Sequence, residues 1–344
     1  MSKERINLKR ACMVALMAWI GTSAHASQFL VPTDQQAIVQ TGNGAPATLK
    51  LETIPVRKPG EGQILIRIYA ASVNPADWAQ LRQPRAVPGL DVSGVVAAVG
   101  PGVKDRLVGT PVFGMVDRTG GDGGYAHYAL ANATSTAPKP RSVSYASAAG
   151  LGVVGVTALG ALDEGQVHAG ARVLITGVAG GVGSAAAQIA LARGATVLGT
   201  ASARHTTYLH RIGVNEIIDY TKGDIAGRAG MVNVVIDTVG GREALEAFRA
   251  LQPGGRFVST ARAAVTPEQC ASAHVRCFGS PGHAASAPVS MLLQVAKLAG
   301  DGNLRIHVDR IYPLVQAAKA LQYSHGGHAE GKIILAVTPQ GGAH

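Results

Sequence analysis

The segment Gly177–Gly183 is the part of this sequence whose residue types point most directly to chemistry. It follows the short apolar run Arg172–Thr176 and precedes Ser184–Arg193, a run of small residues that predicts a helix. A diphosphate group needs a turn without side chains, so that backbone N–H groups can approach it, and the positive end of a helix dipole. The segment therefore predicts a dinucleotide-binding turn, against the alternative of a glycine-rich turn that binds nothing. The residues expected to lie against the diphosphate are Gly180, Gly181, Val182 and Gly183.

The residues that end the next predicted strand bear on which dinucleotide binds. A site that prefers NAD usually has Asp or Glu about 20 residues past the glycine turn, where the carboxylate holds the ribose 2′-hydroxyl. The stretch Thr200–His205 has no acid. Its Ser202 can donate to a phosphate, and Arg204 supplies a guanidinium fork for phosphate oxygens. We therefore expect NADP(H), with an exposed charge at a helix start as the alternative interpretation of Arg204.

The sequence around the turn alternates between predicted strands and predicted helices. Strands are expected at Arg172–Thr176, Ala195–Thr200, Glu216–Asp219, Val232–Asp237 and Arg256–Ser259. Helices are expected at Ser184–Arg193, Tyr208–Ile212 and Arg242–Leu251. Such alternation is typical of right-handed βαβ units, which build a doubly wound parallel sheet. This α/β architecture binds dinucleotides where its strand order reverses.

The first third of the chain and its tail have a different pattern of apolar residues, glycine and proline. Short apolar runs broken by Gly and Pro predict the strands of a barrel-like or sandwich domain. These strands are expected at Gln63–Tyr69, Asp91–Gly100, Pro111–Gly114 and Ala126–Ala129. The tail predicts a strand from Asn303, a helix at Pro313–Gln322 and a final strand at Lys332–Val337. We expect the tail to return to the β-rich domain.

Composition excludes several classes of protein. The chain has 344 residues, of which 47% are hydrophobic, so it is neither disordered nor fibrous. At ~150 residues per domain, its length suggests two domains. The formal net charge is +10, but the basic residues come singly or in short pairs, which does not predict a nucleic-acid partner. Beyond the N-terminus no segment reaches the length of a transmembrane helix, and no stable membrane span is expected.

The first 26 residues have the pattern of a secretory signal peptide. A basic stretch, Lys3–Arg10, is followed by the apolar run Ala11–Gly21 and by Ala24–Ala26, which fits a cleavage site. We predict that residues 1–26 are removed, which lowers the net charge to +7, and that the protein is exported to the periplasm or secreted. A misplaced start codon and a cytoplasmic protein are the alternative. In an oxidising compartment Cys270 and Cys277 could pair, although two buried thiols are the other interpretation.

Together these features resemble the medium-chain dehydrogenase/reductase family, in its zinc-free, quinone oxidoreductase-like branch. The likeness covers about residues 36–337. The segments that carry it are Ala71–Asp77, Pro88–Gly94, Gly123–Ala126, Gly177–Gly183, Asp219-Tyr220, Pro253–Gly255 and Gly327–Lys332. The resemblance implies an NADP-binding Rossmann domain at 151–295, inserted in a GroES-like, β-rich catalytic domain at 36–150 to which residues 296–340 return. A homodimer is expected as well.

The resemblance also implies roles for four further residues. It puts Thr157 near the pyrophosphate or the nicotinamide ribose, and Tyr220 near the adenosine phosphate. Lys332 would lie near the cofactor at the domain cleft, and Asn74 would face the substrate and the nicotinamide. The Asn74 amide could donate to a developing oxyanion. A turn residue that merely precedes Pro75 is the alternative for Asn74.

The sequence departs from the zinc-dependent members of this family. Those carry a cysteine near the Asn74-Pro75 position and Gly-His-Glu where this chain has Gly89-Leu90-Asp91. Without thiolate or imidazole ligands, we expect no zinc that polarises an alcohol or carbonyl. Asp91 is expected to bind backbone groups instead, and no metal is expected at His325 and His328.

The family's thioester reductases have a tyrosine proton donor shortly after their Asn-Pro-x-Asp segment. Trp78–Val87 contains no tyrosine, which leaves no evident general acid. Quinones and enones can take their proton from water, so the protein mainly orients the nicotinamide against them. The resemblance thus implies an NADPH-dependent reductase that passes hydride to a quinone, an enone or a related conjugated carbonyl without zinc. The alternatives are a non-catalytic NADPH-binding protein and a zinc-type alcohol dehydrogenase.

Overall fold

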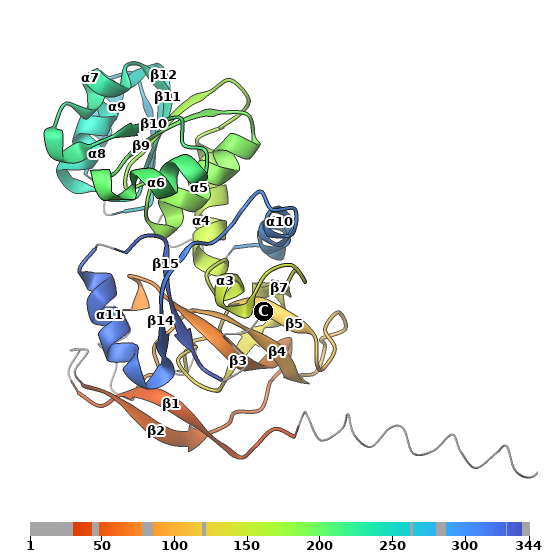
Figure 1. The fold of residues 1–344 in the computed structure, drawn as a ribbon. Coiled ribbons are helices and arrows are strands. Elements are labelled where there is room, and N and C mark those ends of the chain that lie inside the picture. Colours follow the sequence, from red (N-terminus) through yellow and green to blue (C-terminus); the bar gives the residue numbers. More distant parts are fainter. Residues whose placement is uncertain are drawn as a thin grey trace, which may run out of the picture.

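The computed structural model describes residues 30–42, 48–77, 85–118, 122–261, 264–279, 287–327 and 329–338. Most of these residues belong to two parts, each built on one large sheet: a parallel sheet in the upper half of Figure 1 and a β-rich part in the lower half. The predicted leader at residues 1–26 and His328 lie outside the described residues.

The β-rich part is a seven-stranded sheet in which β14-β15-β3-β4-β5-β7 are neighbours in that order and β6 pairs with β3. Its strands are β3 (Gln63–Val73), β4 (Asp91–Val99), β5 (Pro111–Met115), β6 (Tyr128–Asn132), β7 (Thr136–Pro138), β14 (Val308–Pro313) and β15 (Lys332–Ala336). A hairpin of β1 (Asp34–Gln40) and β2 (Leu49–Pro55) accompanies it. Strand β3 is mostly buried because β4, β6 and β15 all pair along it.

The parallel sheet has the order β10-β9-β8-β11-β12-β13. Its strands are β8 (Arg172–Ile175), β9 (Thr196–Thr200), β10 (Glu216–Ile218), β11 (Val232–Asp237), β12 (Leu251–Ser259) and β13 (Arg276–Gly279). The helices of this part are α5 (Gly181–Ala192), α6 (Thr206–Arg211), α7 (Ile225–Ala229), α8 (Gly241–Phe248) and α9 (Pro267–Ser272). The chain runs outward from β8 to β10 and then returns to β11 on the other side of β8. This confirms the predicted doubly wound sheet, whose order reverses beside β8, where such folds bind ligands.

Further helices pack against the β-rich part. They are α3 (Tyr145–Ala149), α4 (Gly152–Glu164), α10 (Val289–Gly300) and α11 (Ala317–His325). Helix α4 packs against α5 and α10 and runs from the β-rich part towards the parallel sheet (Figure 1). The sequence analysis did not predict α4, because its residues are nearly all apolar or glycine and show no amphipathic period.

Several predicted boundaries were wrong, each for a local reason. Helix α5 begins at Gly181 rather than Ser184, because the glycine turn itself supplies the first helical turn. Helix α8 ends at Phe248, because the chain already enters β12 at Leu251. Strand β6 begins at Tyr128, two residues later than predicted, and Ala126 instead forms an isolated bridge with Ala37.

The tail contacts both parts of the molecule. Strand β15 runs antiparallel to β3, with Ile333 opposite Val73. Just before β15, the backbone N–H of Gly331 donates to the Ala179 carbonyl oxygen at 2.9 Å, and Gly331 forms a parallel bridge with Gly180. The start of β15 is therefore tied to the glycine turn.

One disulfide joins Cys270 of α9 to Cys277 of β13. It decides between the two interpretations that the sequence left open for these cysteines. Within the described ranges, no helix is both long enough and apolar enough to span a bilayer.

Candidate active site

A cavity of about 890 Å³ is lined by residues from both parts of the molecule. All the residues that the sequence analysis assigned to a site line it: Asn74, Thr157, Gly180, Gly181, Val182, Gly183, Ser202, Arg204, Tyr220 and Lys332. We call the region of Ser202, Arg204 and Tyr220 the β9 end of the cavity, and the region of Asn74 and Lys332 the β3 end. Residues that are far apart in the sequence thus line one cavity.

The glycine turn is packed closely at Gly181 and Gly183. A Cβ atom on Gly183 would lie 2.4 Å from the Gly177 carbonyl oxygen, and one on Gly181 would lie 2.9 Å from Cδ of Lys332. Gly180 is the N-cap of α5, so the N–H groups of the first helical turn have no acceptor within the helix. Free backbone donors at a helix N-terminus, with no side chain in the way, fit a diphosphate.

A chain of polar contacts follows Arg204 at the β9 end. Nε of Arg204 donates to Nε2 of His205 at 3.0 Å, and Nδ1 of His205 lies 2.6 Å from a carboxylate oxygen of Glu330. The other oxygen of Glu330 lies 3.2 Å from Nε2 of His307. The chain joins the end of β9 to the segment before β15. Sequence analysis missed His205 and Glu330, because a contact between residues 125 positions apart leaves no local pattern.

Sequence analysis also missed a carboxylate near the β9 end. Glu243 of α8 accepts a hydrogen bond from the Thr200 hydroxyl, whose oxygen accepts from the Gly177 N–H at 2.9 Å. Burial raises the pKa of Glu243, and the hydrogen bond from Thr200 opposes part of that rise. No motif marks Glu243, because α8 follows β11 whereas Thr200 ends β9.

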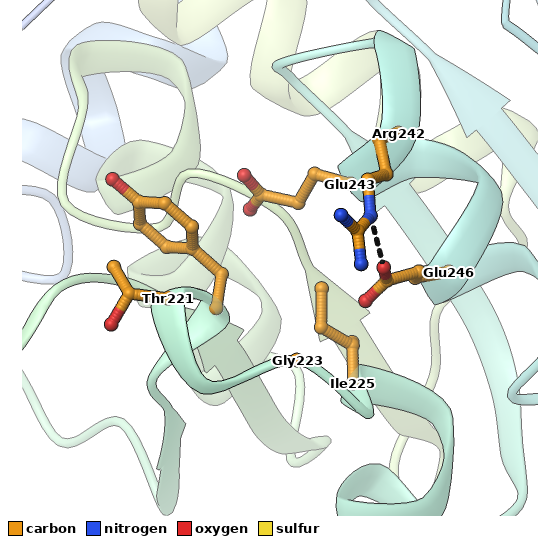
Figure 2. A pocket seen from close by; sticks show the side chains of 7 residues that line it. Thr221, Gly223, Ile225, Arg242, Glu243 and Glu246 are labelled. Atoms are coloured by element: carbon orange, nitrogen blue, oxygen red, sulfur yellow. Dashed lines mark hydrogen bonds and ion pairs between the residues drawn. The ribbon is translucent and has the colours of Figure 1, made fainter.

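A second, smaller cavity of about 270 Å³ adjoins the first, since Tyr220 and Glu243 line both. Figure 2 shows Arg242, Glu243 and Glu246 on one side of it and Thr221, Gly223 and Ile225 on the other. Nε of Arg242 donates to Glu246 at 2.7 Å, drawn as the dashed line.

The β3 end of the cavity holds a hydrogen-bonded trio of Lys332, Asn74 and Asp91. Nζ of Lys332 donates to the Val73 carbonyl oxygen at 2.8 Å and to Oδ1 of Asn74 at 2.7 Å. Nδ2 of Asn74 donates to Oδ2 of Asp91 at 3.0 Å. Oδ1 of Asp91 accepts from the Val153 N–H at 2.9 Å, so Asp91 does bind backbone.

Asp77 fixes the turn that carries Asn74. Its Oδ2 accepts from the Asn74 N–H at 2.8 Å and from the Tyr125 hydroxyl at 2.9 Å, and its own N–H donates to the Asn74 carbonyl oxygen at 3.0 Å. Tyr125 is fully buried in the core of the β-rich part. Asn74 is therefore both a turn residue and a residue of the cavity wall.

Burial dominates the electrostatics of the β3 end. It raises the pKa of Asp77 to about 6 and that of Asp91 to about 6, against the attraction of Lys332. It lowers the pKa of Lys332, which Asp91 and Asp77 oppose. A lysine and two carboxyl groups thus share a site from which water is largely excluded.

Two family models and several known proteins match this chain in sequence. The model of a zinc-binding dehydrogenase matches residues 212–335, and that of the alcohol dehydrogenase GroES-like domain matches residues 60–141. The NADPH-dependent alkenal/one oxidoreductase of Arabidopsis thaliana chloroplasts is 30% identical, over 98% of this chain and 88% of its own length. The quinone oxidoreductase of Sus scrofa is 33% identical, over 85% of this chain and 94% of its own length.

A solved structure agrees with these relatives. The quinone oxidoreductase from Coxiella burnetii matches with a TM-score of 0.82 and 31% identity, over 89% of this chain and all of its own. The chain belongs to the medium-chain dehydrogenase/reductase family. Within this family it falls in the quinone oxidoreductase-like branch and is an oxidoreductase. Its β-rich part is the GroES-like domain, and its parallel sheet is the Rossmann-like domain.

Proposed function

We propose that this medium-chain dehydrogenase/reductase is an NADPH-dependent, zinc-independent reductase of a quinone, an enone or a related conjugated carbonyl. The observation that carries the proposal is the continuity of the large cavity. It offers a guanidinium at Arg204, backbone donors at the glycine turn, and an amide and an ammonium group at Asn74 and Lys332. A dinucleotide with phosphates at one end and a reacting ring at the other matches that order of groups.

The residues at the β9 end support NADPH over NADH. Ser202 and Arg204 would hold the 2′-phosphate, and Tyr220 would lie beside the adenosine. Glu243 opposes a phosphate electrostatically when it is ionised, and its carboxylate already accepts a hydrogen bond from the Thr200 hydroxyl. The glycine turn would bind the diphosphate, with Thr157 next to it. When bound there, the nicotinamide supplies a hydride to the acceptor.

The β3 end supports reduction without zinc. Asn74 and Leu90 stand where the zinc-dependent relatives have ligands, and the Asn74 amide is engaged with Lys332 and Asp91. Among the described residues, no group of three or more His, Cys, Asp or Glu lies close enough together to hold a metal ion. A conjugated carbonyl is already polarised, so hydrogen-bond donors at its oxygen suffice. The relatives named as quinone and alkenal reductases support the same class of acceptor.

A direct assay tests the proposed function. Purified protein, shown to be folded by circular dichroism, is mixed with NADPH or NADH and a panel of quinones and enones, and zinc is measured by elemental analysis. We expect NADPH to be oxidised faster than NADH by protein free of zinc. NADPH binding without oxidation by any acceptor would instead indicate a non-catalytic binding protein, and stoichiometric zinc would indicate an alcohol dehydrogenase.

We also propose that the protein is exported. The Cys270–Cys277 disulfide supports this, because disulfides persist in oxidising compartments. Cell fractionation with N-terminal sequencing tests it. A mature chain that begins near Ser27 outside the cytoplasm is expected, and an uncleaved cytoplasmic chain would refute it.

A further inference from the structure

Lys332 is a buried lysine in the cavity wall, and the proposed reaction still has no assigned proton donor. The residue is 4% exposed. Its stem packs over two glycines, since a Cβ on Gly181 would lie 2.9 Å from its Cδ and one on Gly150 would lie 3.3 Å from its Cγ. This packing directs the ammonium group to the β3 end of the cavity, beside Val73 and Asn74.

As an ammonium group, Lys332 has one donor beyond the two hydrogen bonds that it makes to protein atoms. It carries three N–H groups, of which two are directed at the Val73 carbonyl oxygen and at Oδ1 of Asn74. Because Lys332 lines the cavity, a carbonyl oxygen bound there can accept the third.

Asn74 offers a second donor to the same region. Its amide is oriented from both sides, because Oδ1 accepts from Lys332 and Nδ2 donates to Asp91, which the Val153 N–H holds in turn. One hydrogen on Nδ2 therefore remains for a ligand. Two fixed donors beside one another are the arrangement that stabilises a developing oxyanion.

We propose, on the basis of the function proposed above, that Lys332 is the general acid of the reduction. With Asn74 it binds the carbonyl oxygen of the acceptor. The acceptor gains two electrons as it takes hydride from NADPH, which is oxidised to NADP⁺, and a π electron pair moves onto the oxygen. The N–H bond of Lys332 then breaks, its proton forms an O–H bond, and the electron pair stays on nitrogen. The neutral amine regains a proton from water after the product leaves.

The surroundings of Lys332 suit an acid that is charged before the proton moves and neutral afterwards. Burial lowers its pKa, so the group releases a proton more readily than an exposed lysine does. Asn74 stands between Lys332 and the two buried carboxyl groups, since it bonds Asp91 through Nδ2 and Asp77 through its backbone N–H. The carboxyl groups of Asp77 and Asp91 thus favour the ammonium form of Lys332. The hydrogen bonds of the ammonium group itself go to Val73 and Asn74.

Binding of 4-nitrophenol to the protein saturated with NADP⁺ tests the oxygen-binding role without turnover. The phenolate form absorbs visible light, so the pKa of the bound probe can be read directly. We expect the wild-type protein to lower that pKa by about one pH unit or more, Lys332→Arg to retain most of the effect, and Lys332→Met to abolish it. An unchanged pKa, an equally lowered pKa in Lys332→Met, or a failure of 4-nitrophenol to bind overturns the proposal.

Turnover tests the delivery of the proton. We expect Lys332→Met to lower kcat on the order of 10²-fold with the preferred acceptor while still binding NADPH. Thermal unfolding verifies that each variant is folded. An unchanged kcat in folded Lys332→Met overturns the proposed role of Lys332 but leaves the proposed function of the protein standing. A wild-type protein that oxidises no NADPH with any acceptor refutes the proposed function and the general acid with it.

Discussion

Lys332 donates a hydrogen bond to Asn74 although the two residues are 258 positions apart in the chain. Strand register brings them together. Strand β15 runs antiparallel to β3 with Ile333 opposite Val73, which brings Lys332 close to Asn74, the residue that follows β3. One residue precedes the Rossmann-like domain in the sequence and the other follows it. The β3 end of the cavity therefore depends on a strand pairing that spans the whole of that domain.

The pH dependence of kcat should show an alkaline limb that belongs to Lys332. Burial lowers its pKa below the ordinary 10.5, and only the ammonium form can donate a proton, so kcat should fall as pH rises through that lowered value. Lys332→Arg should lose the limb, because a guanidinium stays charged throughout the accessible range. Steady-state kinetics from neutral to alkaline pH measures this. A limb that persists unchanged in Lys332→Arg would assign it to another group.

Arg204→Ala should weaken NADPH binding much more than NADH binding. Loss of a charge-assisted hydrogen bond of about 1.5–3 kcal/mol raises the Kd for NADPH about tenfold or more. Fluorescence titration with both nucleotides gives the two constants. The matched control is Arg85→Ala, which removes an exposed arginine paired with Glu52 at 3.1 Å. Equal losses for NADPH and NADH in Arg204→Ala would contradict the assigned phosphate contact.

Gly183→Ala should destabilise the protein, whereas Gly180→Ala should not. The added methyl group at position 183 would meet the Gly177 carbonyl oxygen at 2.4 Å, and backbone must shift to admit it. At position 180 the nearest atom is the same oxygen at 3.4 Å, an ordinary contact. We expect a loss of about 1–3 kcal/mol in the free energy of unfolding for Gly183→Ala, measured with urea. Equal stability of the two variants would show that the turn is looser than its packing indicates.

Asp77→Asn should gain stability relative to the wild-type protein as pH rises. Burial raises the pKa of Asp77 from 3.8 to about 6, so between these values the folded protein holds a proton that the unfolded chain has lost. The contribution of Asp77 to stability therefore decreases as pH rises through this window. The amide keeps an oxygen for the Asn74 N–H and the Tyr125 hydroxyl without ionising. The difference in unfolding free energy should change by roughly 2–3 kcal/mol from acidic to neutral pH.

Urea unfolding at a series of pH values tests that expectation. The matched control is Asp301→Asn, which removes an exposed carboxylate paired with Lys297 at 2.6 Å. A parallel pH dependence of Asp77→Asn and the wild-type protein would show that Asp77 ionises as it does in water.

The sequence predicted the features that local patterns encode. The glycine turn was predictable because strand, turn and helix follow one another within a few residues, and the parallel sheet because strands and helices alternate. Asn74 and Lys332 were assigned to the cavity by family resemblance, and both line it. The export signal, the domain limits and the homodimer stay predictions.

The features that the sequence did not reveal depend on register and packing. Nothing near Lys332 in the sequence indicates that its ammonium group meets Asn74, because that contact follows from the pairing of β15 with β3. Glu243 reaches Thr200 from a helix that follows a different strand, and His205 meets Glu330 across the domain boundary. Helix α4 was not predicted because a helix that is buried on most sides lacks the alternation of apolar and polar residues that marks a surface helix.

The hydrogen bond from the Gly331 N–H to the Ala179 carbonyl oxygen joins segments of the chain that are made at different times. Asn74 leaves the ribosome first, the glycine turn follows, and Lys332 emerges with β15, the last strand of the described residues. A chain that ends before β15 has the glycine turn but lacks both Lys332 and the strand that pairs with β3. The wall of the large cavity at its β3 end is therefore complete only once the last strand has been made.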